Sequence, residues 1–275
     1  MKIIDSQLHC FYPNTPARPW PEGVTSPHGP QFTIEQARAL LDQHGVQGAV
    51  LVPPSWNGWD NQYSLDAAVA EPKRFGVMGR FDIEAPDAQE RLKTWRQQPG
   101  MLGVRVFIMG QPWMSLLAPE QDWFWKIAEE TRLPVMAHIP GNIAGFDPVL
   151  QRHPELRLII DHAGRHPRGA MDEGAWADVD QLHALARFRN VSVKVSSLPC
   201  FSTQPYPFPN LHAPIRAMYD RFGPQRLHWG SDMTRLSCSY EENIKLFTQA
   251  LDFLSAEDKE WIMGRALAAA LDWEA

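Results

Sequence analysis

Eight short runs rich in β-branched residues alternate with segments of helical periodicity along this 275-residue chain. The runs predict strands over residues 3–9, 49–53, 75–81, 102–108, 134–139, 156–162, 191–197 and 226–232. Strands that alternate with helices form βαβ units, whose strands lie parallel in one sheet. Eight such units in a chain of this length favour a closed (β/α)8 barrel, the TIM-like fold, over an open sheet. No repeat, low-complexity tract or linker divides the chain, so we expect a single barrel domain over residues 1–275.

The connections between these elements differ in length. Those leading from a helix into a strand are short, whereas long ones rich in Pro, Gly and aromatic residues follow strands 1, 2 and 7, at residues 10–32, 54–63 and 198–210. In a barrel all strand-to-helix loops lie at one end, where active sites are built. The outgoing segments also carry Trp20, Trp56, Trp59 and Trp113. These tryptophans form either a lid over a site or a hydrophobic cluster that packs on itself.

Composition excludes several classes of protein. The chain has 26 Lys and Arg against 32 Asp and Glu, a balance that argues against a general binder of nucleic acid or of anionic membranes. No apolar run is long enough to span a membrane, and Asp5 interrupts the N-terminus before a signal peptide could form. We therefore expect a cytoplasmic protein. Its aromatic loops could also bury against a second copy in a homo-oligomer.

Polar residues recur late in the predicted strands. Because side chains alternate along a strand, Ile4 and Leu8 of the first strand are predicted to face the helices, with Asp5, Gln7 and His9 inside. Later strands carry further polar residues at their inward-facing ends: Arg105, His138, His162, Lys194 and Asp232. A parallel strand buried on both faces should be nearly all apolar, and unpaired buried charge is costly. The pattern therefore predicts a functional site at this end of the barrel.

Two chemistries suit these residues. His9, His138 and Asp232 could bind one divalent metal, Zn or Mn, with an open position for water and with His162 as proton shuttle. Without a metal, Asp232 would deprotonate a water, His162 would orient or protonate, and cationic side chains would bind an anionic substrate. Because these residues are far apart in the sequence, their spacing does not decide between the two versions.

Five short segments resemble one known family. They are residues 4–9 (IDSQLH), 103–105 (GVR), 134–138 (PVMAH), 160–165 (IDHAGR) and 229–232 (WGSD). In this order they resemble the amidohydrolase superfamily, in its amidohydrolase-related group of barrel hydrolases and decarboxylases. The resemblance covers nearly the whole chain. It implies that His9 and the residue two before it are a metal-binding pair, that His138 is the strand-5 ligand, and that Asp232 activates water.

The chain departs from the family pattern at Gln7, which stands where the family has a histidine. Glutamine is a weak, neutral ligand and a poor substitute at a zinc site. Within the group the arrangement most resembles lactonases, including those of the pyrone-dicarboxylate lactonase type, some of which work without metal. The resemblance places Arg105 and Arg165 where such enzymes hold substrate carboxylates, a task for which the guanidinium fork is suited.

The leading interpretation is a hydrolase that opens a lactone, or a similar cyclic ester, of a small carboxylate-bearing molecule. Water activated by Asp232 attacks the carbonyl, while His162 and cationic residues stabilise the oxyanion. Substrate-binding residues would be Arg105, Arg165, Lys194 and Gln7. If they do not bind substrate, Lys194 forms an ion pair with an acid inside the barrel, and Arg105 forms one with Asp82 or Asp5. Two other functions are a metal-dependent decarboxylase of a small aromatic acid and a non-catalytic barrel that binds a small anion.

Overall fold

A computed structural model describes residues 1–22, 29–109, 113–166 and 169–275. Its single sheet has eight parallel strands in chain order: β1 (Ile4–Leu8), β2 (Gly48–Leu51), β3 (Phe75–Arg80), β4 (Met101–Phe107), β5 (Val135–His138), β6 (Leu158–Ile160), β7 (Val191–Ser196) and β8 (Leu227–Gly230). Between the ends of β8 and β1, the N–H of Asp232 donates to the carbonyl of Gln7 at 3.1 Å. The predicted (β/α)8 barrel is thereby confirmed.

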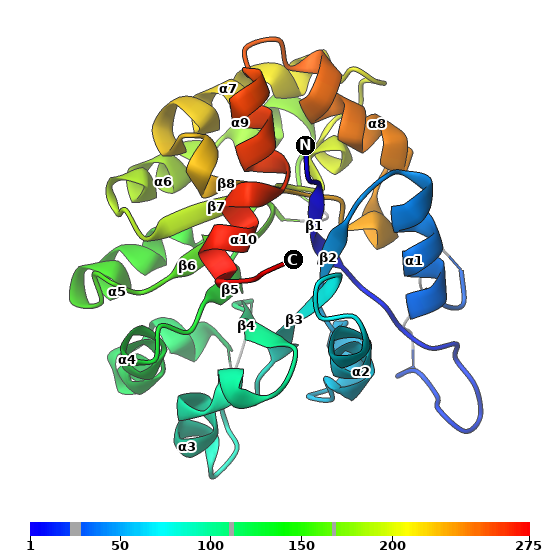
Figure 1. The fold of residues 1–275 in the computed structure, drawn as a ribbon. Coiled ribbons are helices and arrows are strands. Elements are labelled where there is room, and N and C mark those ends of the chain that lie inside the picture. The colour runs from blue at the N-terminus through cyan, green and yellow to red at the C-terminus, as the bar shows by residue number, and fades with distance from the viewer. Residues whose placement is uncertain (23–28, 110–112, 167–168) are drawn as a thin grey trace.

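Helices surround the ring of strands (Figure 1). They are α1 (Ile34–Gln43), α2 (Gln62–Ala70), α3 (Ala88–Lys93), α4 (Asp122–Glu130), α5 (Phe146–Arg152), α6 (Val179–Ala184), α7 (Pro209–Phe222), α8 (Tyr240–Lys245), α9 (Ala256–Glu260) and α10 (Ala266–Leu271). The predicted long connections after β1, β2 and β7 are present, and those after β4 and β6 are long as well. In the described residues no helix is long and apolar enough to cross a membrane.

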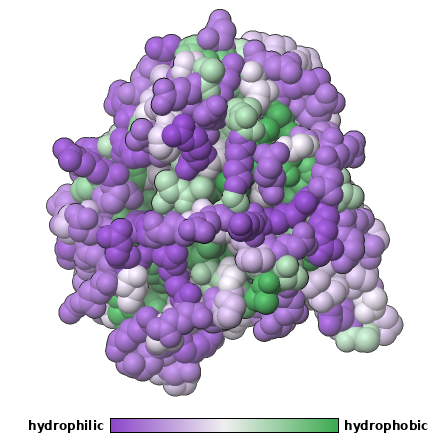
Figure 2. Space-filling view, viewed as in Figure 1, coloured by the Kyte–Doolittle hydropathy of each residue, from purple (hydrophilic) through white to green (hydrophobic). Residues whose placement is uncertain are grey.

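The C-terminal segment closes one end of the barrel. Leu267, Leu271 and Trp273, which we call the barrel floor, pack against interior side chains such as Met78 and Met136. Figure 1 shows α10 lying across the ring, with the C-terminus near its centre. The same face is mostly hydrophilic on its outside, with only small separate apolar areas (Figure 2). Because this end is covered, the opposite end, where the strands finish, is the one open to a ligand.

The first strand does not follow the predicted alternation throughout. Ile4 packs with the interior residues of the barrel, and Asp5 contacts Ser231 and Tyr240 near the start of α8. The predictions that Asp5 faces inward and that Ile4 faces the helices were therefore wrong. The register between β1 and β2 shifts between Asp5 and Leu8, and such an irregularity reverses which side chains point inward. Beyond it, Gln7 faces the interior as predicted, since it contacts Lys194.

Candidate active site

Three neighbouring strands are each followed by a buried residue with left-handed backbone. His162 after β6, Ser197 after β7 and Asp232 after β8 have φ of 51°, 60° and 49°. Non-glycine residues seldom adopt this conformation, and it persists where the surrounding structure holds it, often at functional sites. The turn of the backbone at these positions brings polar side chains together at the mouth of the barrel.

Asp232 lies at the centre of this group. Its Oδ1 is 3.3 Å from Nε2 of His9, and its Oδ2 is 3.6 Å from Nε2 of His162. Oδ2 also accepts a hydrogen bond from Ser197 at 3.2 Å and lies 3.4 Å from Arg235. Burial alone would raise the pKa of Asp232, but these neighbours, His9 first, hold it well below the ordinary value. The side chain is therefore a buried, ionised carboxylate at neutral pH.

Two imidazoles face Asp232 and share one amide. His9 donates from Nδ1 to the carbonyl of Val52 at 2.7 Å, which leaves its Nε2 toward the site. The amide nitrogen of Gln7 lies 3.1 Å from this Nε2 and 3.4 Å from Nε2 of His162. Nδ1 of His162 lies 2.8 Å from the hydroxyl of Ser196. Burial lowers the pKa of His162 to about 3, so this imidazole is neutral.

A buried ion-pair network lies on the other side of Gln7. Asp161 is contacted by Nζ of Lys194 at 3.0 Å and by Nε of Arg105 at 3.0 Å. Lys194 also donates to the amide oxygen of Gln7. Burial alone would raise the pKa of Asp161, but the two cations outweigh it and lower that pKa. Asp161 is therefore the interior acid with which Lys194 pairs, an acid that the sequence analysis did not name.

The partner expected for Arg105 needs correction. The sequence analysis gave Asp82 or Asp5 as the partner of Arg105 in an ion pair. In the structure the partner is Asp161. Asp5 is turned toward Tyr240, and Asp82 accepts from the backbone N–H of Glu84.

His138 reaches the mouth without a hydrogen-bond partner in the part of the chain that the structure describes. Both of its ring nitrogens are buried and unpaired among the described residues. Its ring stacks on Phe107 with centroids 4.9 Å apart and meets His162 edge-on at 5.4 Å. Burial, together with the neighbouring charge of Arg105, lowers its pKa well below 6.5. Since buried polar groups are nearly always paired, this neutral ring has a donor and an acceptor left for a ligand.

These donors do not fit a divalent metal. Among the described residues no group of three His, Cys, Asp or Glu side chains is arranged so that it could hold a metal ion. Asp232 meets His9, but His138 is turned to Phe107 and His162. The metal site predicted from His9, His138 and Asp232 does not form in this arrangement. The physical reason is that Lys194 holds the amide oxygen of Gln7, so that the amide nitrogen, which cannot bind a metal, is the atom that faces the two imidazoles.

Arg165 lies apart from the Asp232 group. It donates to the carbonyls of Ala163 and Ala175 at 3.0 and 2.7 Å, and it forms an ion pair with Asp178. Its Nη2 is buried and has no partner among the described residues. The side chain lines a cavity of about 210 Å³ beside Gly164. The structure thus places Arg165 at the same end of the barrel, next to the mouth rather than in it.

Sequence reasoning missed Arg80. It is the last residue of β3 and stands opposite Arg105 in the β3–β4 pairing. The signal was available, because a charged residue ends an otherwise apolar strand at an inward position, as in β4.

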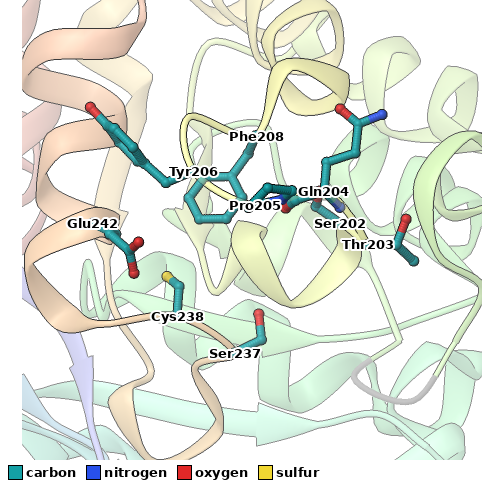
Figure 3. A pocket seen from close by; sticks show the side chains of 9 residues that line it. All are labelled: Ser202, Thr203, Gln204, Pro205, Tyr206, Phe208, Ser237, Cys238 and Glu242. Carbon is teal, nitrogen blue, oxygen red and sulfur yellow. The ribbon is translucent and has the colours of Figure 1, made fainter.

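The outgoing loops enclose two further cavities. One, of about 330 Å³, is shown in Figure 3, where Tyr206 and Phe208 from the loop after β7 lie across from Ser237 and Cys238 from the loop after β8. The other measures about 410 Å³ and has an aromatic wall that includes Trp20 and Trp56. The lining of these two cavities includes neither Asp232 nor the imidazoles of His9 and His162.

The loop tryptophans differ in what they contact. Trp20 and Trp56 pack on each other and on Phe11, with ring centroids 5.3–5.7 Å apart. Trp59 instead lies against Arg80. The side chain of Trp113 lies outside the described residues.

Comparison with known proteins identifies the family. The model of the amidohydrolase family matches residues 4–269. The chain belongs to this family. It is 29% identical over 241 residues to an L-fucono-1,5-lactonase of Burkholderia ambifaria, covering 83% of this chain and 79% of the relative. It is 26% identical over 245 residues to a 4-sulfomuconolactone hydrolase of Rhizobium radiobacter, covering 83% and 74%.

A solved structure has the same fold. An amidohydrolase from Burkholderia multivorans with bound zinc superposes with a TM-score of 0.82 at 22% identity, covering 99% of this chain and all of that one. Family membership makes the chain a hydrolase, so the alternative of a non-catalytic barrel is set aside.

Proposed function

We propose that this amidohydrolase opens a lactone, or a similar cyclic ester, of a small molecule that carries a carboxylate. The observation that carries the proposal is the buried, ionised Asp232 between His9 and His162 in a mouth rich in cations. The two relatives described above are named for the hydrolysis of lactones. An anionic substrate fits a site where positive charge exceeds negative.

Asp232 acts as the general base. It takes a proton from a water whose oxygen bonds to the ester carbonyl carbon, giving a tetrahedral oxyanion. The ring C–O bond then breaks, and the leaving oxygen receives the proton. Nε2 atoms of His9 and His162, at 3.3 and 3.6 Å from the carboxylate, are placed to relay that proton. General acid–base catalysis by positioned groups of this kind contributes about 10²–10⁴-fold to the rate.

Gln7 and Lys194 position the imidazoles. Lys194 donates to the amide oxygen of Gln7, so the amide nitrogen must face His9 and His162. Because Lys194 is fully buried and paired with Asp161, we assign it a positioning role rather than contact with the substrate. The same charge-assisted network fixes which way the Gln7 amide points.

Unpaired donors receive the substrate. The neutral ring of His138 can donate one N–H to the oxyanion that develops on the carbonyl oxygen. The free Nη2 of Arg165 can bind a polar substituent of the substrate in the cavity beside Gly164. Arg105 adds positive charge, although Asp161 neutralises much of it.

The decarboxylase alternative is less well supported. The sequence resemblance associates that reaction with a bound metal, and the donor set of His9, His138 and Asp232 does not fit one. Hydrolysis by Asp232 and the imidazoles beside it needs only groups that the chain supplies.

Product analysis tests the function. Purified protein is assayed by proton release against five- and six-membered lactones with a carboxylate, and by CO₂ release against hydroxybenzoates. We expect lactone opening, lost in Asp232→Asn and kept in the control Asp220→Asn, whose exposed carboxylate pairs with Arg216. Release of CO₂ without opening of any lactone would overturn the proposal.

A further inference from the structure

The backbone of Arg80 is tied to Asn61 at the mouth end of β3. Its backbone N–H donates to Oδ1 of Asn61 at 2.8 Å, and its carbonyl accepts from Nδ2 of Asn61 at 3.0 Å. Its side chain lies on the same face of β3 as Met78, which packs inside the barrel. The guanidinium carbon lies 5.0 Å from the ring centre of Trp59. The side chain is thus aimed and supported before any ligand arrives.

No carboxylate of the described residues neutralises this guanidinium. Among the described residues, none lies within ion-pair distance of Arg80, and Nε of Arg80 is buried without a hydrogen-bond partner. The remaining residues, 23–28, 110–112 and 167–168, contain no Asp or Glu. Two acids on neighbouring segments have other partners: Asp161 contacts Arg105 and Lys194, and Asp82 accepts from the N–H of Glu84.

The charges at the mouth therefore do not balance. Four cationic side chains gather there, Arg80, Arg105, Lys194 and Arg235, against the two carboxylates of Asp161 and Asp232. Burial, and then the charge of Arg105, lowers the pKa of Arg80 to about 10, so it remains charged at neutral pH. A partly buried cation without a partner destabilises a folded protein, and a ligand that supplies the missing anion removes that cost.

We propose that Arg80 binds the carboxylate of the substrate and makes the enzyme selective for anionic lactones. The planar guanidinium fork matches a carboxylate in two parallel hydrogen bonds, and the ring of Trp59 covers part of its surface. Arg105 and Arg165 are less available for this task because Asp161 and Asp178 already neutralise them. The inference rests on the proposed lactone hydrolysis.

A matched pair of substrates tests the assignment. The wild type, Arg80→Gln and the control Arg91→Gln are assayed on one carboxylated lactone and on its neutral methyl ester. Arg91 is an exposed arginine of α3 outside the barrel. For Arg80→Gln we expect kcat/KM to fall about 10- to 100-fold on the carboxylate, the value of a charged hydrogen bond, mainly through KM. The ester offers no negative charge to Arg80, so its kcat/KM should fall far less than that of the carboxylate in Arg80→Gln, and neither value should change in Arg91→Gln. Equal losses on both substrates, or no loss on either, would overturn the inference.

Binding without turnover separates this inference from the proposed function. Citrate and its trimethyl ester are titrated calorimetrically into the same three proteins. We expect citrate to bind the wild type and Arg91→Gln, to bind Arg80→Gln at least about tenfold more weakly, and the ester to bind none of them. If no lactone is opened but citrate binding depends on Arg80, the function fails and the anion site stands. If citrate binds all three proteins alike, or none of them, the anion site fails.

Folding of the variant is checked in parallel. Removing an unpaired charge should leave the free energy of unfolding of Arg80→Gln unchanged or higher. Should this variant fail to fold, Arg80→Lys keeps the charge but loses the fork, and it should weaken only the carboxylated substrate. An equal effect of Arg80→Lys on both substrates would also overturn the inference.

Discussion

Nζ of Lys194 lies 3.0 Å from Oδ1 of Asp161, and both side chains are completely buried. The ammonium group also donates to the amide oxygen of Gln7, which faces the two imidazoles of the site. One interior cation therefore joins the structural network of the barrel to its candidate catalytic group. Perturbing this pair should affect stability and turnover together.

Lys194→Met should destabilise the fold. It removes one partner of a buried pair and leaves Asp161 with Arg105 alone, which costs about 3–5 kcal/mol for pairs of this kind. Urea unfolding measures the loss. The double variant Asp161→Asn/Lys194→Met should lose less unfolding free energy than the two single variants together, because each single change leaves the other charge buried without this partner. Additive losses would show that the two side chains do not interact.

Asp161 should also make stability depend on pH. Its pKa is lowered in the folded protein, so its contribution is present above the unfolded value of about 3.9 and is lost as pH falls below it. Unfolding free energies at a series of pH values between neutrality and pH 3 compare wild type with Asp161→Asn. The wild type should lose stability faster below about pH 4. Parallel curves would contradict a depressed pKa.

Asp232→Asn should reduce kcat by about 10²–10⁴-fold with little change in KM, because the amide cannot accept the proton of water. Ser197→Ala, which removes only the 3.2 Å hydrogen bond to Oδ2 of Asp232, should lower kcat by about tenfold or less. Steady-state kinetics on the best lactone measures both. A larger effect of the serine substitution than of Asp232→Asn would contradict the role given to the carboxylate.

Trp273→Ala should destabilise the barrel without changing its chemistry. The side chain packs in the barrel floor, and its Nε1 donates to the carbonyl of Pro72 at 2.9 Å. Truncation of a buried tryptophan costs about 3–5 kcal/mol, whereas Trp273→Phe should cost less because the ring still fills most of the space. Thermal unfolding ranks the variants. Loss of kcat in folded Trp273→Ala would show that the floor and the mouth are coupled.

The sequence predicted the barrel because its evidence is local and repeated. The alternation of strands and helices, and the polar residues late in strands, can be read from short windows. The inward direction of Arg105 and Lys194 followed from that alternation and is confirmed by their contacts with Asp161.

The features that the sequence did not predict depend on contacts between segments that are distant in the chain. The register shift in β1 is set against β2, and it turned Asp5 away from the interior. Asp161 and His162 are consecutive, so a continued strand would send them to opposite faces. The strand stops at Ile160, and the left-handed backbone of His162 brings both into the mouth. The partner of Arg105 could not be named from sequence for this reason.

The most direct test of the account is lactone turnover by protein stripped of metal. Metal content per chain is measured before and after chelation, and kcat is then compared with and without added zinc. If Asp232, the two imidazoles and the Lys194–Gln7 pair carry the reaction, kcat is unchanged by chelation and by zinc. Loss of turnover on chelation, restored by about one equivalent of zinc per chain, would contradict the account, since a catalytic zinc supplies the activated water itself.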